Sequence, residues 1–594
     1  MNYKAERHSS YRVDKEGNVE LMANFTARIT KEIRTVDGIK QSTTLTIIGK
    51  QFDPDNKEPN DPNDPEAGGT ELPPITIDAE EFTAMSWVLP RWGVQAVIRP
   101  GASIKDDLRT FIQLRSTPDI ETVYRAIGWQ KVNDQTVYIH AGGAVTAKGN
   151  DEKVSVALPR ELSRYNLLGS IKKTDIAEAI AQQTQLLAVT MPEITWPLLA
   201  ATLAPLLGPV DFAVHLTGRT GTFKTEVMSL FQSCYGKEMD ARHMPASWSS
   251  TANALEAQAY YAANAPLVID DFVPSGTTWQ VRGYQTKADA IIRAQGNQAG
   301  RARLTDTSNL QTTMYPRGII LSTGEDTPEG QSVRARMLIL ELSPGDVNTQ
   351  HLTNSQKKRA MLPTGTAAFI RWIIANKPEI TPRVEEERSK HLEIGHSRTP
   401  GMLARLIVTA EVWTEYLEER GSLSKQTGAA MRKAARTHIL FAGNKQQGYL
   451  ESTDPTDVFT QAIRHALGAG LAHIRSLNGG VPKKPQMLGW IEENSQGEMP
   501  TYKAKGPCMG WIEWNKDEIY IDITTGYPII KKVAGAEITL TKQTMIKRLK
   551  DAGLIVRADE GRQRNTIRIK ADNNARTVIV LPASTTLETQ EVPE

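Results

Sequence analysis

Residues 212–225 read Phe212-Ala-Val-His-Leu-Thr-Gly-Arg-Thr-Gly-Thr-Phe-Lys224-Thr225. The apolar run at 212–216 predicts a buried strand, and a helix is expected over 226–235. The glycines between them let backbone N–H groups turn toward phosphate oxygens, and the N-terminus of the following helix adds partial positive charge. The stretch therefore predicts a phosphate-binding loop between a strand and a helix.

The spacing from Gly218 to Lys224 and Thr225 matches the pattern G-x-x-x-x-G-K-[ST], except that Phe223 stands where a glycine is usual. In this pattern the lysine reaches the β- and γ-phosphates and the hydroxyl binds Mg²⁺, so ATP and Mg²⁺ are the expected cofactors. An ordinary strand–turn–helix with a solvated lysine is the alternative. The residues expected around the nucleotide are Gly218, Thr220, Gly221, Thr222, Phe223, Lys224, Thr225 and Glu226.

Two carboxylates follow the next apolar strand, at 266–270. On a parallel sheet the carboxyl end of that strand lies beside the phosphate loop, where ligands bind. We expect Asp270 to hold Mg²⁺ through water and Asp271 to polarise the water that attacks the γ-phosphate. The alternative is a strand that simply ends in an acidic turn.

A third apolar strand, at 318–322, ends at Thr323, which is placed to hydrogen-bond the γ-phosphate or the attacking water. Arg334 and Arg336 then precede another strand, where an arginine can stabilise transition-state charge on a neighbouring subunit's nucleotide. The order of these features predicts ATP hydrolysis, with Lys224, Asp271, Thr323, Arg334 and Arg336 as the catalytic residues. A degenerate core that only holds ATP is the alternative.

The length of 594 residues predicts three or four domains, and the net charge of +2 confines any nucleic-acid site to a local patch. Cys234 and Cys508 form neither a disulfide framework nor a zinc motif, which fits a reducing cytoplasm. No window of about 18 uninterrupted apolar residues is present, so we expect no contact with a membrane.

The chain predicts an α/β fold with four parts. Residues 1–160 alternate polar and apolar positions and form a β-rich N-terminal domain, with a mobile acidic loop at 53–74. Residues 161–350 form the ATPase core on a parallel sheet, and 351–500 form a helical region. Residues 501–594 form a C-terminal domain in which a helix at 541–550 precedes a hairpin of 555–558 with 566–569, the outline of a winged helix.

Two basic segments are candidates for DNA contact. Residues 531–570 carry 11 Lys/Arg and 4 Asp/Glu, and residues 281–317 carry 6 and 2. The second segment is expected to form a hairpin at 301–313 that grips a DNA backbone. A solvated basic face is the alternative for the first segment, and a surface insertion or subunit contact for the second. The residues expected to contact DNA are Arg301, Arg303, Lys547, Arg548, Lys550, Arg562 and Arg564.

Taken together, these residues resemble the replicative helicases of phages and mobile elements, which are AAA+ proteins with a hairpin before the first sensor and relatives of minichromosome-maintenance helicases. The motifs that carry the resemblance are Gly218-Arg-Thr-Gly-Thr-Phe-Lys-Thr225, Ile269-Asp-Asp271, Ser322-Thr-Gly-Glu325 and Arg334-Ala-Arg336. The resemblance implies an AAA+ P-loop core, an N-terminal collar, a C-terminal winged helix and a homohexameric ring around one DNA strand. It also implies a primase-polymerase as a candidate partner, and the cytoplasm of a bacterial or phage-infected cell.

We therefore expect an ATP-dependent DNA helicase or translocase. One alternative is an ATP-dependent origin-binding initiator or helicase loader that does not unwind DNA processively. Another is a non-catalytic nucleotide-binding scaffold that uses its basic C-terminal domain to anchor other replication proteins on DNA.

Overall fold

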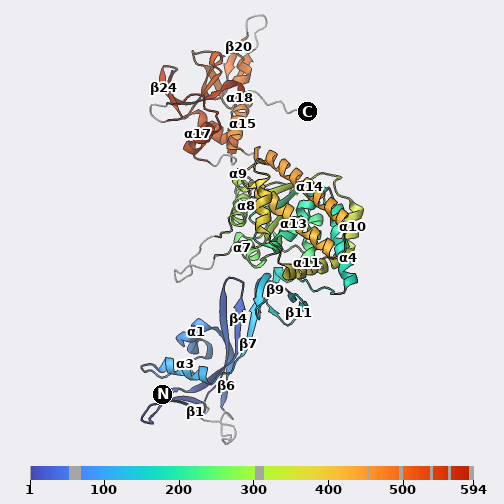
Figure 1. Ribbon diagram of the computed structural model, residues 1–594. Coiled ribbons are helices and arrows are strands. Elements are labelled where there is room, and N and C mark those ends of the chain that lie inside the picture. Colours follow the sequence, from blue (N-terminus) through green and yellow to red (C-terminus); the bar gives the residue numbers. More distant parts are fainter. Residues whose placement is uncertain are drawn as a thin grey trace. The chain divides into compact units, whose positions relative to one another are not determined.

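The protein has a mixed α/β fold. The computed structural model describes residues 2–51, 69–300, 313–451, 454–493, 500–535, 540–559 and 564–587 (Figure 1). The chain divides into two compact units, which are described separately. The first comprises Met1–Asp326, Leu340–Glu387 and Ala404–Ile439, and the second comprises Thr327–Ile339, Arg388–Leu403 and Leu440–Glu594. Within the described ranges, no helix combines the length and the apolar character that crossing a bilayer requires.

The N-terminal part is rich in strands, as its alternating sequence predicts. A three-stranded antiparallel sheet joins β1 (Asn2–Glu6), β2 (Ser9–Val13) and β3 (Val19–Ala23). A second sheet has the order β12-β7-β4-β5-β6, formed by β4 (Phe25–Val36), β5 (Gln41–Gln51), β6 (Thr70–Asp78), β7 (Asp119–Tyr124) and β12 (Ser155–Val156). Apolar residues from these strands pack with α1 (Ala79–Ala84), α2 (Val88–Trp92) and α3 (Ile104–Leu114) around Phe25, Trp87 and Phe111. Residues 53–68 of the acidic loop expected at 53–74 lie outside the described residues, and residues 70–74 belong to β6 instead of the loop.

A four-stranded antiparallel meander follows, with β8 (Gly128–Val132), β9 (Gln135–His140), β10 (Gly143–Thr146) and β11 (Gly149–Asp151). Side chains of β8 and β9 donate hydrogen bonds to two segments that lead into the central sheet. The Trp129 indole N–H donates to the Leu206 carbonyl at 3.0 Å, and the Tyr138 hydroxyl donates to the Asn264 carbonyl at 3.0 Å. Gly128 fits this junction because a Cβ there would lie 2.6 Å from the Ala263 carbonyl oxygen.

Burial of His140 at the end of β9 makes the stability of the fold sensitive to acid. Burial lowers the pKa of His140 from 6.5 to about 4, while its Nδ1 accepts backbone N–H bonds from Gly142 at 3.1 Å and Leu167 at 3.3 Å. The unfolded chain therefore binds a proton more readily. The contribution of neutral His140 to the free energy of unfolding is fully present above pH 6.5. It is lost as the pH falls from 6.5 toward 4, and the loss is about 3 kcal/mol at most.

We expect His140→Asn, which keeps an acceptor and cannot titrate, to lose less stability than the parent between pH 7.5 and pH 4.5. The measurement is the Tm of both proteins across that range, because the difference between them removes the contribution of other groups. If the Tm of both proteins fell equally with pH, His140 would not take up a proton on unfolding.

The central sheet has the order β14-β15-β16-β13-β17. Its members are β13 (Ala213–Gly218), β14 (Ala246–Ser247), β15 (Pro266–Phe272), β16 (Ile319–Gly324) and β17 (Met337–Leu342). The pairs β14–β15, β15–β16 and β16–β13 are parallel, so these four strands end at one edge. The chain leaves β13 for the far side of the sheet and returns to place β16 beside it. A crevice at such a point is where open α/β sheets bind ligands.

Helices surround this sheet. The helix that follows the glycine loop, α6 (Lys224–Gln232), packs on β13, β15 and β16, and α8 (Thr278–Asn297) packs on β13 and β16. The expected helical region contains α10 (Thr349–Lys358), α11 (Leu362–Asn376), α12 (Thr381–Ser389), α13 (Thr399–Glu419) and α14 (Lys425–Glu451). Arg436 of α14 joins three of these helices, because it donates at 3.0 Å to Glu387 of α12 and at 2.9 Å to Glu411 of α13.

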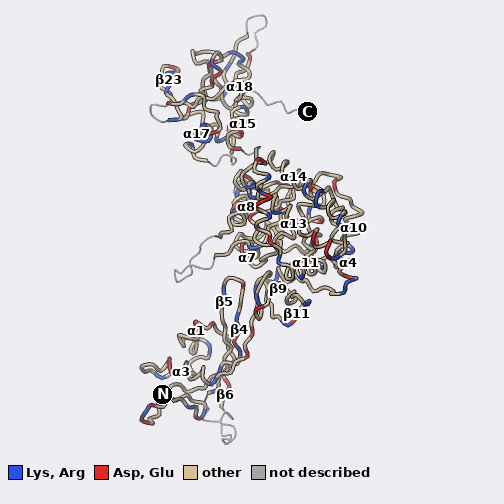
Figure 2. Tube along the Cα trace, viewed as in Figure 1, with Lys and Arg blue, Asp and Glu red and all other residues tan. Residues whose placement is uncertain are grey.

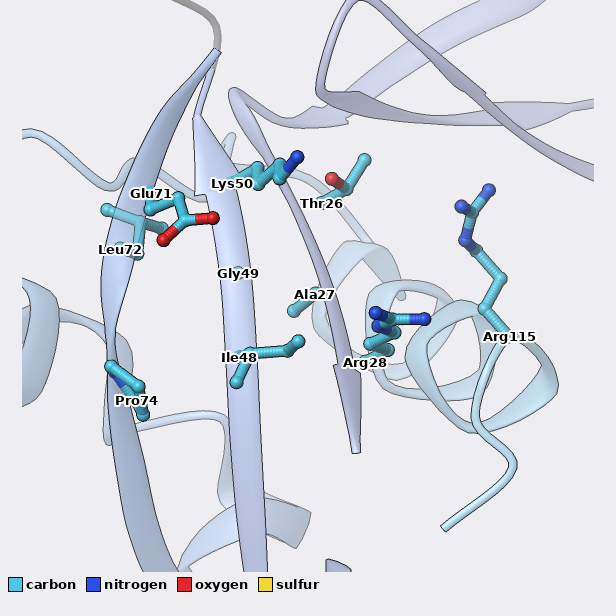
Figure 3. Close-up of a pocket in the computed structure, with 10 residues that line it drawn as sticks. All are labelled: Thr26, Ala27, Arg28, Ile48, Gly49, Lys50, Glu71, Leu72, Pro74 and Arg115. Atoms are coloured by element: carbon cyan, nitrogen blue, oxygen red, sulfur yellow. The ribbon is translucent and has the colours of Figure 1, made fainter. Parts of the chain in front are cut away.

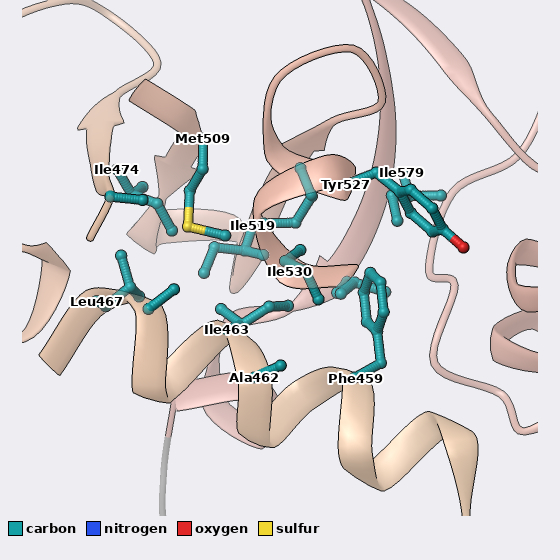
Figure 4. Packing of buried hydrophobic residues seen from close by; sticks show 14 of the residues in the cluster. Phe459, Ala462, Ile463, Leu467, Ile474, Met509, Ile519, Tyr527, Ile530 and Ile579 are labelled. Atoms are coloured by element: carbon teal, nitrogen blue, oxygen red, sulfur yellow. The ribbon is translucent and has the colours of Figure 1, made fainter. Parts of the chain in front are cut away.

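The C-terminal sheet has the order β18-β21-β22-β24-β23, formed by β18 (His473–Ser476), β21 (Cys508–Glu513), β22 (Glu518–Asp522), β23 (Ile567–Ala571) and β24 (Asn574–Pro582). It packs with α15 (Pro455–Gly468), α16 (Gly526–Ala534) and α17 (Lys542–Asp551) around one apolar cluster. Figure 4 shows Phe459, Ile463 and Leu467 of α15 facing Met509 and Ile530. The cluster therefore includes residues that precede 501, where the sequence places the start of this domain.

The expected hairpin between 555–558 and 566–569 does not form a ladder of paired strands in the described residues. At the predicted turn, Asp559 and Arg564 form one antiparallel bridge, in which the Asp559 N–H donates to the Arg564 carbonyl at 2.9 Å and the Arg564 N–H donates to the Asp559 carbonyl at 3.1 Å. The antiparallel hairpin joins β23 to β24 and turns at Asp572 and Asn573, whose φ angles are 48° and 62°. Asp and Asn tolerate this left-handed backbone better than most residues, so the turn forms there. Residues 555–558 contribute an isolated bridge between Arg557 and Val580.

Candidate nucleotide site

The loop after β13 depends on its two glycines. A Cβ on Gly218 would lie 2.3 Å from the Leu342 carbonyl oxygen, so only glycine lets the loop start this close to β17. Gly221 has a φ of +84° and open space around the position of its missing Cβ. The loop is therefore tightly packed at its base and open at its middle.

Phe223 occupies the position where the sequence pattern usually has glycine. It caps α6 with a left-handed backbone, φ 63° and ψ 22°, and its side chain is 46% exposed. A left-handed phenylalanine costs about 1–2 kcal/mol relative to its right-handed conformation. The chain thus turns into α6 as a glycine would allow, and the bulky ring is accommodated in part by solvent.

Three sequence-predicted residues from separate elements meet at one carboxylate oxygen. Thr225, in the first turn of α6, donates its hydroxyl to Asp270 Oδ1 at 3.0 Å. Thr323, at the end of β16, donates its hydroxyl to the same oxygen. The parallel strands bring these side chains together because β15 and β16 end at the edge where α6 begins.

Asp270 is a partly buried acid with little to compensate its charge. Burial raises its pKa, the hydroxyls of Thr323 and Thr225 oppose that rise, and the charge of neighbouring Asp271 adds to it. A cation bound beside this carboxylate would stabilise its ionised form. Together with the Thr225 hydroxyl it offers oxygen ligands of the kind that Mg²⁺ prefers.

Asp271 lies at an irregularity in the strand. The register between β15 and β16 shifts between Ile269 and Phe272, and Asp271 has a φ of 68°. Its N–H donates to the Thr323 hydroxyl at 3.1 Å, while its side chain is exposed. The bulge therefore turns two consecutive carboxylates in different directions, one inward and one toward solvent.

Lys224 is folded over the glycine loop. Its Nζ donates to the Arg219 carbonyl at 2.9 Å, and the Thr222 hydroxyl donates to the same carbonyl at 2.8 Å. The ammonium group thus lies at the loop, where the first N–H groups of α6 have no partner within the helix. Glu226, in the same turn of α6, accepts a bond from the Gln356 amide at 2.6 Å.

The glycine loop, Lys224, Thr225 and Asp270 together fit a Mg²⁺-bound nucleotide. A glycine loop, an ammonium group, a hydroxyl and a carboxylate converge at one helix N-terminus. Among the residues that the structure describes, no group of three or more His, Cys, Asp or Glu side chains gathers as a metal centre would. A magnesium ion held by one carboxylate and one hydroxyl would complete its shell with water and phosphate oxygens.

Sequence reasoning missed several residues around these side chains. Glu325 accepts the Thr220 hydroxyl bond through its carboxylate, and the Thr217 hydroxyl donates to the Glu325 carbonyl at 3.3 Å. Buried His215 contacts the Ser322 hydroxyl at 3.0 Å through Nδ1. Glu325 is visible in the sequence two residues after Thr323, but nothing there indicates its partner.

Arg334 and Arg336 belong to the second unit, at α9 (Gln331–Arg334) and just beyond it. Arg334 donates to the Pro328 carbonyl at 3.0 Å and to the Thr327 hydroxyl at 2.9 Å, and Arg336 donates to the Ser332 carbonyl at 2.6 Å. Arg334 also donates to the Tyr449 carbonyl of α14 at 3.3 Å, so both guanidinium groups are held by residues of the second unit. The role of either one toward another subunit stays a prediction.

Three of the predicted DNA-contact residues, Lys547, Arg548 and Lys550, are exposed on α17, whose opposite side is buried through Met545 and Leu549. Figure 2 marks the Lys and Arg positions along the chain in blue. Arg564 is exposed as well. The remaining three, Arg301, Arg303 and Arg562, lie outside the described residues.

A separate hollow of about 120 Å³ opens on the N-terminal sheet (Figure 3). Three cationic side chains and one carboxylate line it, from Arg28, Lys50, Arg115 and Glu71. Among the residues that the structure describes, none of those predicted for the nucleotide or for DNA lines this hollow.

Comparison with known proteins agrees with this fold. A family model described as "Domain of unknown function (DUF927)" matches residues 89–313, a stretch that contains the glycine loop and both aspartates. A solved structure titled "SCCmec type IV Cch - active helicase" is similar at 14% sequence identity, with a TM-score of 0.51 over 98% of each chain. At that identity the likeness shows a shared fold over nearly the whole length. No curated protein matches the chain.

Proposed function

We propose that this chain is an ATP-dependent DNA helicase or translocase that serves the replication of a phage or mobile element. The observation that carries the proposal is the convergence of Thr225 and Thr323 on Asp270 beside a glycine loop and Lys224. The similar solved structure is described as an active helicase, which supports the motor function over a static nucleotide-binding role.

Each residue then has a defined task. Lys224 holds the β- and γ-phosphates, and Thr225 and Asp270 hold the metal, which when bound neutralises charge on the phosphate oxygens. Asp271 takes a proton from the attacking water, and Thr323 orients that water or the phosphate it attacks. In a homohexameric ring of AAA+ subunits, Arg334 or Arg336 of one copy acts on the nucleotide of the next.

DNA contact is assigned to two regions in this proposal. The segment that contains Arg301 and Arg303 grips a single strand in the ring, and the exposed cations of α17 bind duplex at a fork or origin. A primase-polymerase is the candidate partner. A C-terminal winged helix is supported by the packing of α17 against a sheet that ends in the β23–β24 hairpin.

The test compares ATP turnover with and without single-stranded DNA, together with strand separation on a forked duplex. A motor gives Mg²⁺-dependent turnover that DNA stimulates, and it separates the fork. Turnover without separation would favour the initiator or loader. Binding of ATP without turnover would favour the scaffold and contradict the proposal.

The double variant Arg301→Ala with Arg303→Ala is expected to keep basal ATP turnover and to lose strand separation, because it removes phosphate contacts and leaves the nucleotide site untouched. The matched control is Lys105→Ala with Lys15→Ala, which removes the same charge from exposed positions of the N-terminal part. Fork separation at the parental rate in the arginine variant would refute the role of this segment.

A further inference from the structure

Glu325 places a negative charge on the loop that is assigned to phosphate. Its carboxylate accepts the hydroxyl bond of Thr220, which stands between Gly218 and Gly221 in the glycine loop. Both Thr220 and Glu325 are exposed, so the contact lies at the open side of the loop. Phosphate groups at the same place would be repelled by the Glu325 carboxylate and would compete with it for the Thr220 hydroxyl.

The backbone beneath Glu325 is held on both sides. The Glu325 N–H donates to the Phe272 carbonyl at 3.2 Å, and its carbonyl accepts the Thr217 hydroxyl at 3.3 Å. A Cβ on the preceding Gly324 would lie 2.5 Å from the Phe272 carbonyl oxygen, so the chain passes too close there for another residue type. The main chain is therefore fixed, and displacement of the carboxylate requires only side-chain rotation.

A buried hydrogen-bonded chain secures this backbone from below. The Trp248 indole N–H, which only donates, bonds to the Ser322 hydroxyl oxygen at 2.8 Å. The Ser322 hydrogen is then available for His215 Nδ1 at 3.0 Å, and His215 Nε2–H donates to the Asp326 carbonyl at 2.8 Å. Residues 322 and 326 are thus anchored to β13 on either side of Glu325.

We propose that Glu325 is a phosphate-responsive latch of the nucleotide site. Without nucleotide, its carboxylate holds Thr220 across the glycine loop. The entry of a nucleoside triphosphate displaces that carboxylate, so the charge of Glu325 weakens binding of the triphosphate and keeps the affinity moderate. The inference rests on the proposed nucleotide site and deepens it, because it names a residue that sets the affinity of that site for phosphate.

The test is titration calorimetry of the full chain in Mg²⁺ with a slowly hydrolysed ATP analogue, ADP and AMP. Glu325→Gln keeps an acceptor for Thr220 and removes the charge. We expect it to tighten binding of the ATP analogue about 5- to 30-fold, of ADP less and of AMP least, in proportion to the phosphate charge near the loop. The control is Glu238→Gln, which removes an exposed carboxylate just beyond α6 and should match the parent.

Salt separates electrostatic opposition from a structural effect. Because ions screen interactions between exposed charges, the ratio of the parent and Glu325→Gln dissociation constants should move toward one in 1 M salt. A change in folding or loop shape would leave that ratio nearly constant, which would overturn the proposal.

The remaining outcomes are separable. Equal or weaker binding of the ATP analogue by Glu325→Gln would overturn the latch, and loss of turnover at unchanged affinity would make Glu325 a catalytic base instead. If the parent itself binds no nucleotide, the proposed function fails and takes the latch with it. Parental binding with no gain in Glu325→Gln removes the latch alone.

Discussion

Replacing Lys224 with alanine is expected to lower the rate of ATP turnover about 100- to 1,000-fold. In the proposed site the ammonium group is the cation that the glycine loop contributes to the phosphates, and loss of one such preorganised donor costs a factor of this size. The fold should remain intact because the side chain makes one bond to the loop, with the Arg219 carbonyl at 2.9 Å. Steady-state ATP turnover and the Tm of the variant measure the two effects separately.

The matched control for this substitution is Lys237→Ala, an exposed lysine shortly after α6. It removes the same charge near the same helix without touching the glycine loop. Turnover by Lys224→Ala at the rate of the parent and of Lys237→Ala would show that the loop does not carry the nucleotide.

Replacing Asp270 with asparagine is expected to lower turnover about 100-fold or more and to raise the Mg²⁺ concentration needed for half-maximal rate. The amide oxygen still accepts the hydroxyl bonds of Thr225 and Thr323, so the local structure is kept while the charge on the metal is lost. A magnesium titration of turnover measures the effect, and chelation of the metal should stop the parent and the variant alike.

Asp134→Asn is the control, since it removes a carboxylate from an exposed turn of the N-terminal meander where asparagine also tolerates a φ of 63°. An unchanged magnesium dependence in Asp270→Asn would remove Asp270 from the metal site. It would also leave the meeting of Thr225 and Thr323 at Asp270 as an ordinary structural contact.

The central contacts follow from sequence because they depend on strand order and direction. Apolar runs that end in Gly218, Asp270 and Thr323 are the elements of a parallel sheet, and their polar residues must meet where parallel strands end. The mixed α/β fold could be predicted on the same grounds. The parallel pairing of β13, β15 and β16 confirms that part of the prediction.

The residues beside those contacts could not be predicted in the same way. The bond between Glu325 and Thr220 depends on how far the chain travels past the end of β16, and a one-residue bulge at Asp271 changes which side chains face the loop. His215 and Trp248 read as ordinary core residues in sequence. The Trp248 indole N–H and His215 Nδ1 both bond to the hydroxyl of Ser322, which lies between them, and His215 Nε2 bonds to the Asp326 carbonyl.

The C-terminal hairpin shows a different limit of prediction from sequence. Asp559-Glu-Gly561 and Asp572-Asn573 are both good turn sequences, and local propensity does not rank one above the other. The structure forms a ladder of paired strands at the second, where pairing of β24 with β22 and β23 buries Val578 and Val580 in the sheet, and only a single bridge, between Asp559 and Arg564, is described at the first. Tertiary packing therefore decides which of the two turns joins a ladder of paired strands.

The most direct measurement is an experimental structure of the chain with Mg²⁺ and a slowly hydrolysed ATP analogue. The account predicts a metal ion about 2.0–2.1 Å from the Thr225 hydroxyl oxygen. Asp270 should lie beside that ion, Lys224 on the β- and γ-phosphates, and Glu325 turned away from Thr220. A nucleotide bound elsewhere, with Lys224 and Asp270 unchanged in their contacts, would contradict it.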